Sequence, residues 1–209
     1  YTSNDSDAQR WYFEQAGNGA YYLRSKGSDL YLDVANSSTE NGANIQINRQ
    51  NRSAAQQFRL QKVGDLIPEG VYTIASGLDS GKVVDISAAS VANGANVQLY
   101  TTNGSVAQKF RFVSAGDGQY YIMNVGSEKV LDVASGSSVP GTNVQQWEKN
   151  NTGAQRWWLE NAGNGMYYIR SVGTELFLDV DNASTADGTN IKVYTGNYVA
   201  AQQFALIAS

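Results

Sequence analysis

The chain has 209 residues, of which 42% are hydrophobic and 16% charged, and its formal net charge is −4. This hydrophobic content excludes intrinsic disorder, and the acidic balance without a basic stripe argues against a nucleic-acid partner. No run of 18 apolar residues is present, so membrane insertion is not expected. His and Cys are absent, which removes the commonest general base, the commonest metal ligand and any thiol nucleophile.

The tetrapeptide Ala-Gln-x-(Trp/Phe) occurs five times, starting at Ala8, Ala55, Ala107, Ala154 and Ala201. The steps between copies are 47, 52, 47 and 47 residues. A period of this size is typical of one supersecondary unit that must share its core with neighbouring copies. We number the four full repeats in chain order by their closing aromatic residues, which are Phe58, Phe110, Trp157 and Phe204.

In chain order, each full repeat opens with a strand rich in Tyr and reaches an apolar-Asp-apolar triplet some ten residues later. A loop of small residues then ends in Gly-x-Asn, and an alternating strand such as NIQIN or NVQLY follows. The Ala-Gln-x-aromatic strand closes the repeat. Period-two alternation between Gly, Asn and Ser turns predicts four short strands per repeat and an all-β fold.

The one longer step, between Ala55 and Ala107, holds five extra residues near positions 64–70. We interpret this insertion as a joint between two domains, residues 1–64 and residues 65–209. The second domain would contain three complete repeats. The first would contain one complete repeat and the last strand of another.

Five Gln-x-aromatic closing strands, four triplets of the Leu-Asp-Val type and a period near 47 together resemble the ricin-type β-trefoil lectins, and most closely their bacterial carbohydrate-binding modules. The resemblance covers the whole chain. It implies three repeats around a pseudo-threefold axis, closed as a six-stranded barrel with a hairpin cap. Residues 65–209 would then be a complete trefoil, and residues 1–64 the C-terminal part of a preceding one.

One repeat and a strand cannot close a barrel, so we expect residues 1–64 to leave apolar edges open. Three arrangements would cover these edges. The segment could self-associate with another copy, borrow a missing piece, or be ordered by packing on the complete trefoil.

The resemblance also implies one shallow sugar pocket per repeat. In such a pocket the triplet Asp accepts hydrogen bonds from hydroxyl groups, a ring stacks on the sugar, and amide side chains complete the contacts. The second repeat offers Asp85, Tyr100, Asn103 and Gln108. The third offers Asp132, Trp147, Asn150 and Gln155, and the fourth offers Asp179, Tyr194, Asn197 and Gln202.

Two repeats depart from this pattern. The first has Asn48 at the ring position, so we expect its site to be weak or inactive. The fourth has Lys192 where the others have Gln46, Gln98 and Gln145, so its preference should differ. Each residue type also has a structural interpretation: Asp and Gln can satisfy backbone groups, and Asn tolerates a left-handed backbone.

We therefore expect a non-catalytic carbohydrate-binding module, without cofactor or metal, that tethers a larger secreted or cell-surface protein to glycans. The glycans would be galactose-type sugars or plant or cell-wall polysaccharides. Several weak sites would add through avidity. The absence of Cys favours a bacterial source.

The alternative is an interaction or scaffold trefoil without sugar sites, in which Tyr100, Trp147 and Tyr194 would be buried. An enzyme is not expected. The acidic residues recur once per repeat, and on a threefold fold they would lie too far apart to act as a pair.

Overall fold

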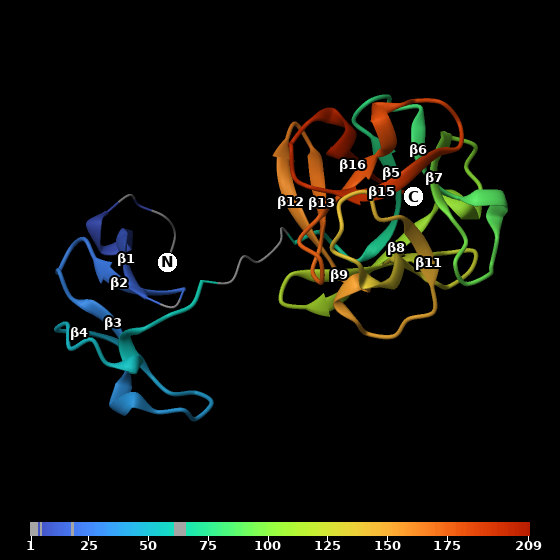
Figure 1. Cartoon of the computed structure of the whole chain (residues 1–209). Coiled ribbons are helices and arrows are strands. Elements are labelled where there is room, and N and C mark those ends of the chain that lie inside the picture. The colour runs from blue at the N-terminus through green and yellow to red at the C-terminus, as the bar shows by residue number, and fades with distance from the viewer. Residues whose placement is uncertain (1–3, 5, 18, 61–65) are drawn as a thin grey trace. The chain divides into compact units, whose positions relative to one another are not determined.

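The structure is a computed structural model that describes residues 4, 6–17, 19–60 and 66–209. It divides the chain into two compact units, Tyr1–Lys62 and Val63–Ser209 (Figure 1). The predicted boundary between residues 64 and 65 lies outside the described residues. Within those residues every helix is a three-residue 3₁₀ turn, which confirms the all-β prediction.

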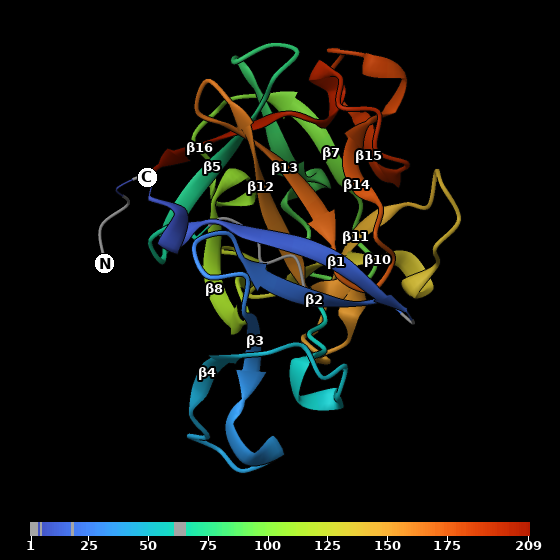
Figure 2. The same cartoon turned by 90° about the vertical axis from the view of Figure 1, so that its left-hand side faces the viewer.

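The N-terminal unit is an open four-stranded sheet in the order β1-β2-β3-β4 (Figure 2). Its strands are β1 (Trp11–Gly17), β2 (Ala20–Ser25), β3 (Tyr31–Val34) and β4 (Ile45–Asn48). The antiparallel hairpin of β1 and β2 pairs Trp11 with Ser25, and an isolated bridge joins Tyr21 to Phe58. β1 has no second neighbour among the described strands of this unit.

In the C-terminal unit six strands close a ring. They are β5 (Gly70–Ser76), β8 (Phe110–Gly116), β9 (Gln119–Asn124), β12 (Trp157–Gly163), β13 (Met166–Ser171) and β16 (Phe204–Ala208). Each pairs antiparallel with the next in this order, and β16 returns to β5 through five residue pairs from Phe204–Ser76 to Ala208–Tyr72. The barrel therefore has no free edge.

Three two-stranded hairpins complete this unit. They are β6 (Lys82–Ile86) with β7 (Val97–Thr101), β10 (Val130–Val133) with β11 (Val144–Trp147), and β14 (Phe177–Val180) with β15 (Thr189–Tyr194). β15 also pairs with β7. Single bridges join Asn96, just before β7, to Gln145, and Asn143, just before β11, to Lys192. A six-stranded barrel with three hairpins in threefold arrangement is a β-trefoil, as the resemblance implied.

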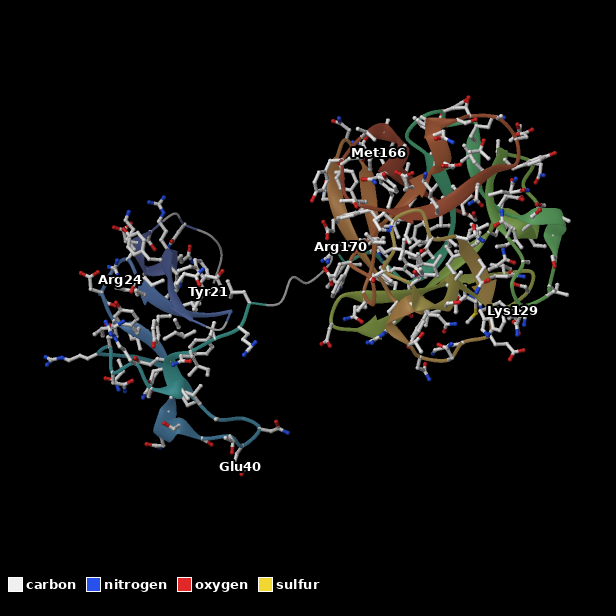
Figure 3. The ribbon with its side chains drawn as sticks, in the orientation of Figure 1. Tyr21, Arg24, Glu40, Lys129, Met166 and Arg170 are labelled. Atoms are coloured by element: carbon white, nitrogen blue, oxygen red, sulfur yellow. The ribbon has the colours of Figure 1, made fainter. Side chains whose placement is uncertain are left out.

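The period-two pattern explains the core of this unit. The closing aromatics Phe110, Trp157 and Phe204 have no solvent exposure. Ile74 and Ile169, from the opening strands, are equally buried. Alternate side chains of each strand point to one face, so the three repeats fill a single interior, and Figure 3 shows side chains crowding it.

Candidate functional site

The third repeat places a carboxylate opposite an amide on the hairpin of β10 and β11. Asp132 and Gln145 are direct partners across the two strands, so their side chains share one face. Gln145 Nε2 donates a hydrogen bond to Asp132 Oδ1 at 3.0 Å. Asp132 is 6% exposed, and in the part of the chain that the structure describes its Oδ2 has no protein partner. One oxygen is thus fixed while the other can accept from a ligand.

An aromatic ring stands beside this carboxylate. Trp147 follows Gln145 by two residues on β11 and lies on the same face of the strand. It is 39% exposed, so its indole is not part of the core. Asp132, Gln145, Trp147 and Asn150 line one cavity of about 620 Å³, which is open to solvent. The structure therefore brings together three of the four residues that the sequence predicts for this repeat.

The second repeat has the same geometry. Asp85 faces Gln98 across β6 and β7, and Gln98 Nε2 donates to Asp85 Oδ1 at 2.9 Å. Tyr100 is 38% exposed and lines a cavity of about 310 Å³ with Asp85, Gln98 and Asn103. The two repeats thus present a carboxylate, a ring and an exposed amide in equivalent positions.

The fourth repeat keeps the ring but changes the groups around it. Lys192 stands opposite Asp179, pairs with Asp181 and lies 4.0 Å from Asp179 Oδ1. Its ammonium group also lies 5.0 Å from the ring centroid of Tyr194, which is 40% exposed. Gln202 Nε2 donates to Asp179 Oδ2 at 3.0 Å. Both oxygens of this carboxylate therefore face a protein donor, which is not so for Asp132.

Burial raises the pKa of Asp179 above its ordinary value. The hydrogen bond from Gln202 and the charge of Lys192 act in the opposite direction, and the charge of Asp181 adds to the rise. Because burial is the largest influence, the protonated form of Asp179 is favoured in the folded protein relative to an exposed carboxyl.

The closing glutamines are not available to a ligand, which corrects the prediction for Gln108, Gln155 and Gln202. All three are at most 1% exposed. Their Oε1 atoms accept from the backbone N–H of Asn103, Asn150 and Asn197 at 2.7–3.0 Å. Their Nε2 atoms donate to the carbonyls of Thr101, Glu148 and Thr195 at 2.9–3.0 Å. Each amide thus fixes the loop that carries the pocket Asn, and this structural role was the alternative interpretation.

The pocket asparagines combine both interpretations. Asn103 and Asn150 are exposed and line their pockets. Each Oδ1 also accepts a backbone N–H two residues ahead, from Ser105 at 2.9 Å and Thr152 at 3.0 Å, which closes an Asx turn. Asn197 is exposed as well and makes a longer bond of the same type, 3.4 Å, to Val199. The turn uses the oxygen and leaves the amide nitrogen at the surface.

The first repeat retains the carboxylate and amide without the ring. Asp33 is 4% exposed and accepts from Gln46 at 2.9 Å, whereas Asn48 occupies the ring position. The Asp–Gln pair therefore also has a structural role in the hairpin.

The pocket wall contains residues that the sequence reasoning missed. Ser135 and Gly136 of the third repeat line the cavity and have φ of 56° and 60°. Thr152 and Gly153 also line this cavity. The sequence feature that could have identified these residues is the run of small residues after each triplet, because small side chains leave room beside the carboxylate.

Across the described ranges 4, 6–17, 19–60 and 66–209, no three acidic side chains gather into a potential metal site. Over the same residues, no helix has the length and apolar character needed to cross a membrane.

Comparisons with known proteins agree with this geometry. The family model described as "Ricin-type beta-trefoil lectin domain-like" matches residues 7–100, 54–147 and 106–194. The designed threefold-symmetric protein ThreeFoil is 35% identical, with a TM-score of 0.66, over 67% of this chain and 99% of its own. The C-half of an earthworm R-type lectin, solved with GalNAc, is 18% identical, with a TM-score of 0.54, over 68% of this chain and 100% of its own.

The exo-β-1,3-galactanase 1,3Gal43A from Clostridium thermocellum is 24% identical, with a TM-score of 0.65, over 91% of this chain. This chain spans only 43% of that enzyme. No curated protein matches. The overlapping family matches together span residues 7–194, which is most of the chain, and we conclude that the chain belongs to the ricin-type β-trefoil lectin domain family.

Proposed function

We propose that the chain binds sugars non-catalytically through the pockets of its second and third repeats, with a modified site in the fourth. One observation carries this proposal: Asp132, Trp147 and Asn150 meet in one open cavity, and Asp85, Tyr100 and Asn103 repeat the arrangement. The exposed rings argue against the scaffold alternative, which requires them to be buried. A pyranose would stack its C–H face on the ring and direct hydroxyl groups to the free carboxylate oxygen.

The role that follows is attachment. A single shallow site of this kind binds a monosaccharide at about millimolar Kd, and several sites on one rigid domain strengthen binding to a repetitive glycan. We propose that the module tethers a larger secreted or cell-surface protein to galactose-type sugars or to plant or cell-wall polysaccharide. GalNAc, the sugar in the earthworm lectin structure, is a natural first ligand to test.

Titration of the chain with GalNAc, galactose and xylose, followed by NMR, tests the proposal. The indole N–H signal of Trp147 should shift with a binding sugar. Trp147→Ala and Asp132→Asn should each weaken binding at the third repeat by about tenfold or more while the fold persists. Asp33→Asn is the matched control, because it changes the same triplet in the repeat without a ring. Equal binding by the Trp147→Ala protein and the parent would contradict the proposal.

A further inference from the structure

The fourth repeat carries an exposed aromatic side chain beside its pocket, at a position where the other repeats have no ring. Tyr198 directly follows the pocket residue Asn197 and is 58% exposed. At the equivalent position the third repeat has Asn151 and the second has Gly104. All three residues have a positive φ, of 61°, 63° and 71° respectively. Asn and Gly tolerate this left-handed backbone, whereas a bulky aromatic residue has it only at a cost in free energy.

Hydrogen bonds hold the strained backbone of Tyr198 in place. Gln202 Oε1 accepts from the N–H of Asn197 at 3.0 Å and from the N–H of Tyr198 at 3.2 Å. The hydroxyl of Tyr168 donates to the carbonyl of Tyr198 at 3.2 Å. Gln203 Nε2 donates in turn to the hydroxyl of Tyr168 at 3.1 Å. The surroundings therefore impose this backbone conformation, and imposed strain of this kind is concentrated at ligand sites.

Two other rings support the side chain of Tyr198. Its ring centroid lies 5.6 Å from that of Phe177 and 5.3 Å from that of Tyr168, and both contacts are edge to face. Phe177 and Tyr168 also pack edge to face, at 6.2 Å. The third repeat has the smaller Val130 in place of Phe177. More than half of Tyr198 remains exposed in spite of these contacts, so the cluster fixes the ring and leaves it accessible.

The aromatic cluster is continuous with the pocket of the fourth repeat. Phe177 is the direct cross-strand partner of Tyr194, so the two side chains share one face of the hairpin of β14 and β15. Asp179 and Lys192, two residues away on each strand, lie on the same face. Tyr194 is 40% exposed, whereas Phe177 is buried. The buried ring of Phe177 is therefore adjacent to two exposed rings, Tyr194 and Tyr198.

The pocket of this repeat offers a single sugar fewer free acceptors than the third pocket does. Lys192 and Gln202 face the two oxygens of Asp179. Asp132 Oδ2, by contrast, has no protein partner in the part of the chain that the structure describes. A pyranose stacked on Tyr194 therefore gains less from the carboxylate. A second exposed ring nearby adds a stacking surface for the next sugar of a chain.

We propose that Tyr198 forms a second sugar subsite, so that the fourth repeat binds two consecutive sugars of a glycan chain. The ring of Tyr194 stacks on the first pyranose and the ring of Tyr198 on the next. The ligand class is thus an oligosaccharide or polysaccharide, whereas the second and third pockets each have one ring for one sugar. This inference rests on the proposed sugar binding. The alternative is that Tyr198 only covers Phe177, which predicts an effect on stability and none on the preference for a longer sugar.

The test compares monosaccharides with disaccharides, by NMR titration of the full chain. The sugars are galactose with β-1,3-galactobiose, and xylose with xylobiose. Tyr100→Ala and Trp147→Ala are introduced together, so that the fourth repeat retains its pocket ring while the second and third lose theirs. In this background chain one disaccharide should bind at least about tenfold more tightly than its monosaccharide.

Adding Tyr198→Asn should abolish the preference for the disaccharide. Asn is the residue of the third repeat at this position and suits the backbone, so the fold should persist. Tyr198→Phe retains the ring and should retain the preference. Val199→Ala, in the same turn and 48% exposed, is the matched control and should also retain it. Tyr194→Ala should weaken the binding of both sugars, because it removes the first ring.

Two results would overturn the proposal. The first is a background chain that binds monosaccharide and disaccharide equally, and the second is a preference that Tyr198→Asn leaves intact. If the indole signal of Trp147 in the parent chain still shifts with sugar, the subsite alone is wrong and the proposed function stands. If the parent chain binds none of these sugars, both proposals are wrong.

Discussion

At the scale of single residues, the same residue type serves two purposes in each repeat. Gln145 orients a carboxylate at the pocket surface, while Gln155, ten residues later, is fully buried and holds the backbone of the adjacent loop. Both are Gln in polar, turn-rich sequence. The two glutamines differ in burial, and a side chain without solvent exposure cannot contact a sugar.

Replacing Gln155 should therefore lower the stability of the fold and should not remove a direct contact to a sugar. Gln155→Ala removes two hydrogen bonds and leaves the N–H of Asn150 and the carbonyl of Glu148 without their partner. We expect a loss of about 1–3 kcal/mol in the free energy of unfolding, measured by urea titration. Asn150→Ala, at the exposed end of the same loop, is the comparison and should cost less than Gln155→Ala. A neutral Gln155→Ala would show that the loop does not depend on this amide.

Asp179 should make the stability of the fourth repeat depend on pH. Its pKa is raised in the folded state, so folding favours its protonated form. The resulting stabilisation is fully present below the unfolded pKa and is lost as pH rises through the folded pKa. Asp179→Asn should therefore flatten the dependence of Tm on pH across the acidic range. Identical Tm–pH curves for the two proteins would contradict the burial argument.

At the scale of elements, two equivalent hairpins carry the same ionic motif at different depths. On β12 and β13, Arg170 pairs with Glu160 at 2.6 Å and stacks over Trp158, and both charged side chains are at most 9% exposed. On β1 and β2, Arg24 pairs with Glu14 at 2.6 Å and stacks over Tyr12, but the two charged side chains are 28% and 36% exposed (Figure 3). The difference arises from packing, since the motif is the same.

The extent of burial should determine how much each ion pair contributes to the free energy of unfolding. Glu160→Gln leaves the buried guanidinium of Arg170 with only the exposed Glu175, and we expect a loss of about 3–5 kcal/mol. Glu14→Gln should cost about 0–1 kcal/mol, as for partly exposed pairs. Chemical denaturation of both variants provides the measurement. Equal losses would mean that burial does not determine the outcome.

In the C-terminal unit, a backbone hydrogen bond from Gly141 N–H to Val193 O at 2.8 Å joins two repeats, and it depends on a backbone conformation that L-residues rarely adopt. Gly141 has φ +94° and open space around its missing Cβ. Gly141→Ala should thus destabilise the C-terminal unit by about 1–3 kcal/mol through backbone strain alone. Ser138→Ala, in the same exposed loop, should be close to neutral. A neutral Gly141→Ala would remove the strain argument.

At the scale of the whole molecule, the sequence predicted the fold well because the repeated motif extends along nearly the whole chain. The strands follow from period-two alternation and from one alignment of five motifs, whereas the hairpins and the pairing of Asp with a ring in the pockets were implied by the resemblance to the ricin-type lectins. The depth of side chains was harder to predict. For Gln108, Gln155 and Gln202 the sequence leaves a sugar contact and a structural role both open, because the pattern gives the face of a strand but does not show which residues a loop covers. The altered surroundings of Asp179 also needed coordinates, since Asp181 and Lys192 are 11 residues apart.

The two units should unfold separately. The N-terminal unit has an open sheet and exposed apolar positions, whereas the C-terminal barrel is closed, so the first should melt at a lower temperature. Trp11 is the only Trp of the N-terminal unit, and the other three lie in the C-terminal unit. Trp11→Phe should therefore remove the earlier transition from a fluorescence melt and retain the later one. A single shared transition would contradict the division.

Backbone hydrogen bonds join the three repeats of the C-terminal unit in a cycle: Gly94 N–H donates to Gln146 O, Gly141 N–H to Val193 O, and Gly188 N–H to Leu99 O. This cycle restricts how the number of repeats in the unit can change. Each repeat gives a bond to one neighbour and takes one from the other, so the ring closes with three members. Duplicating or deleting one repeat would leave an unsatisfied edge, whereas a triplet could be gained or lost without exposing any interior. A chain that lacks one of the three repeats of the C-terminal unit should accordingly be less stable than the parent chain, because the two remaining repeats would each lose a backbone partner.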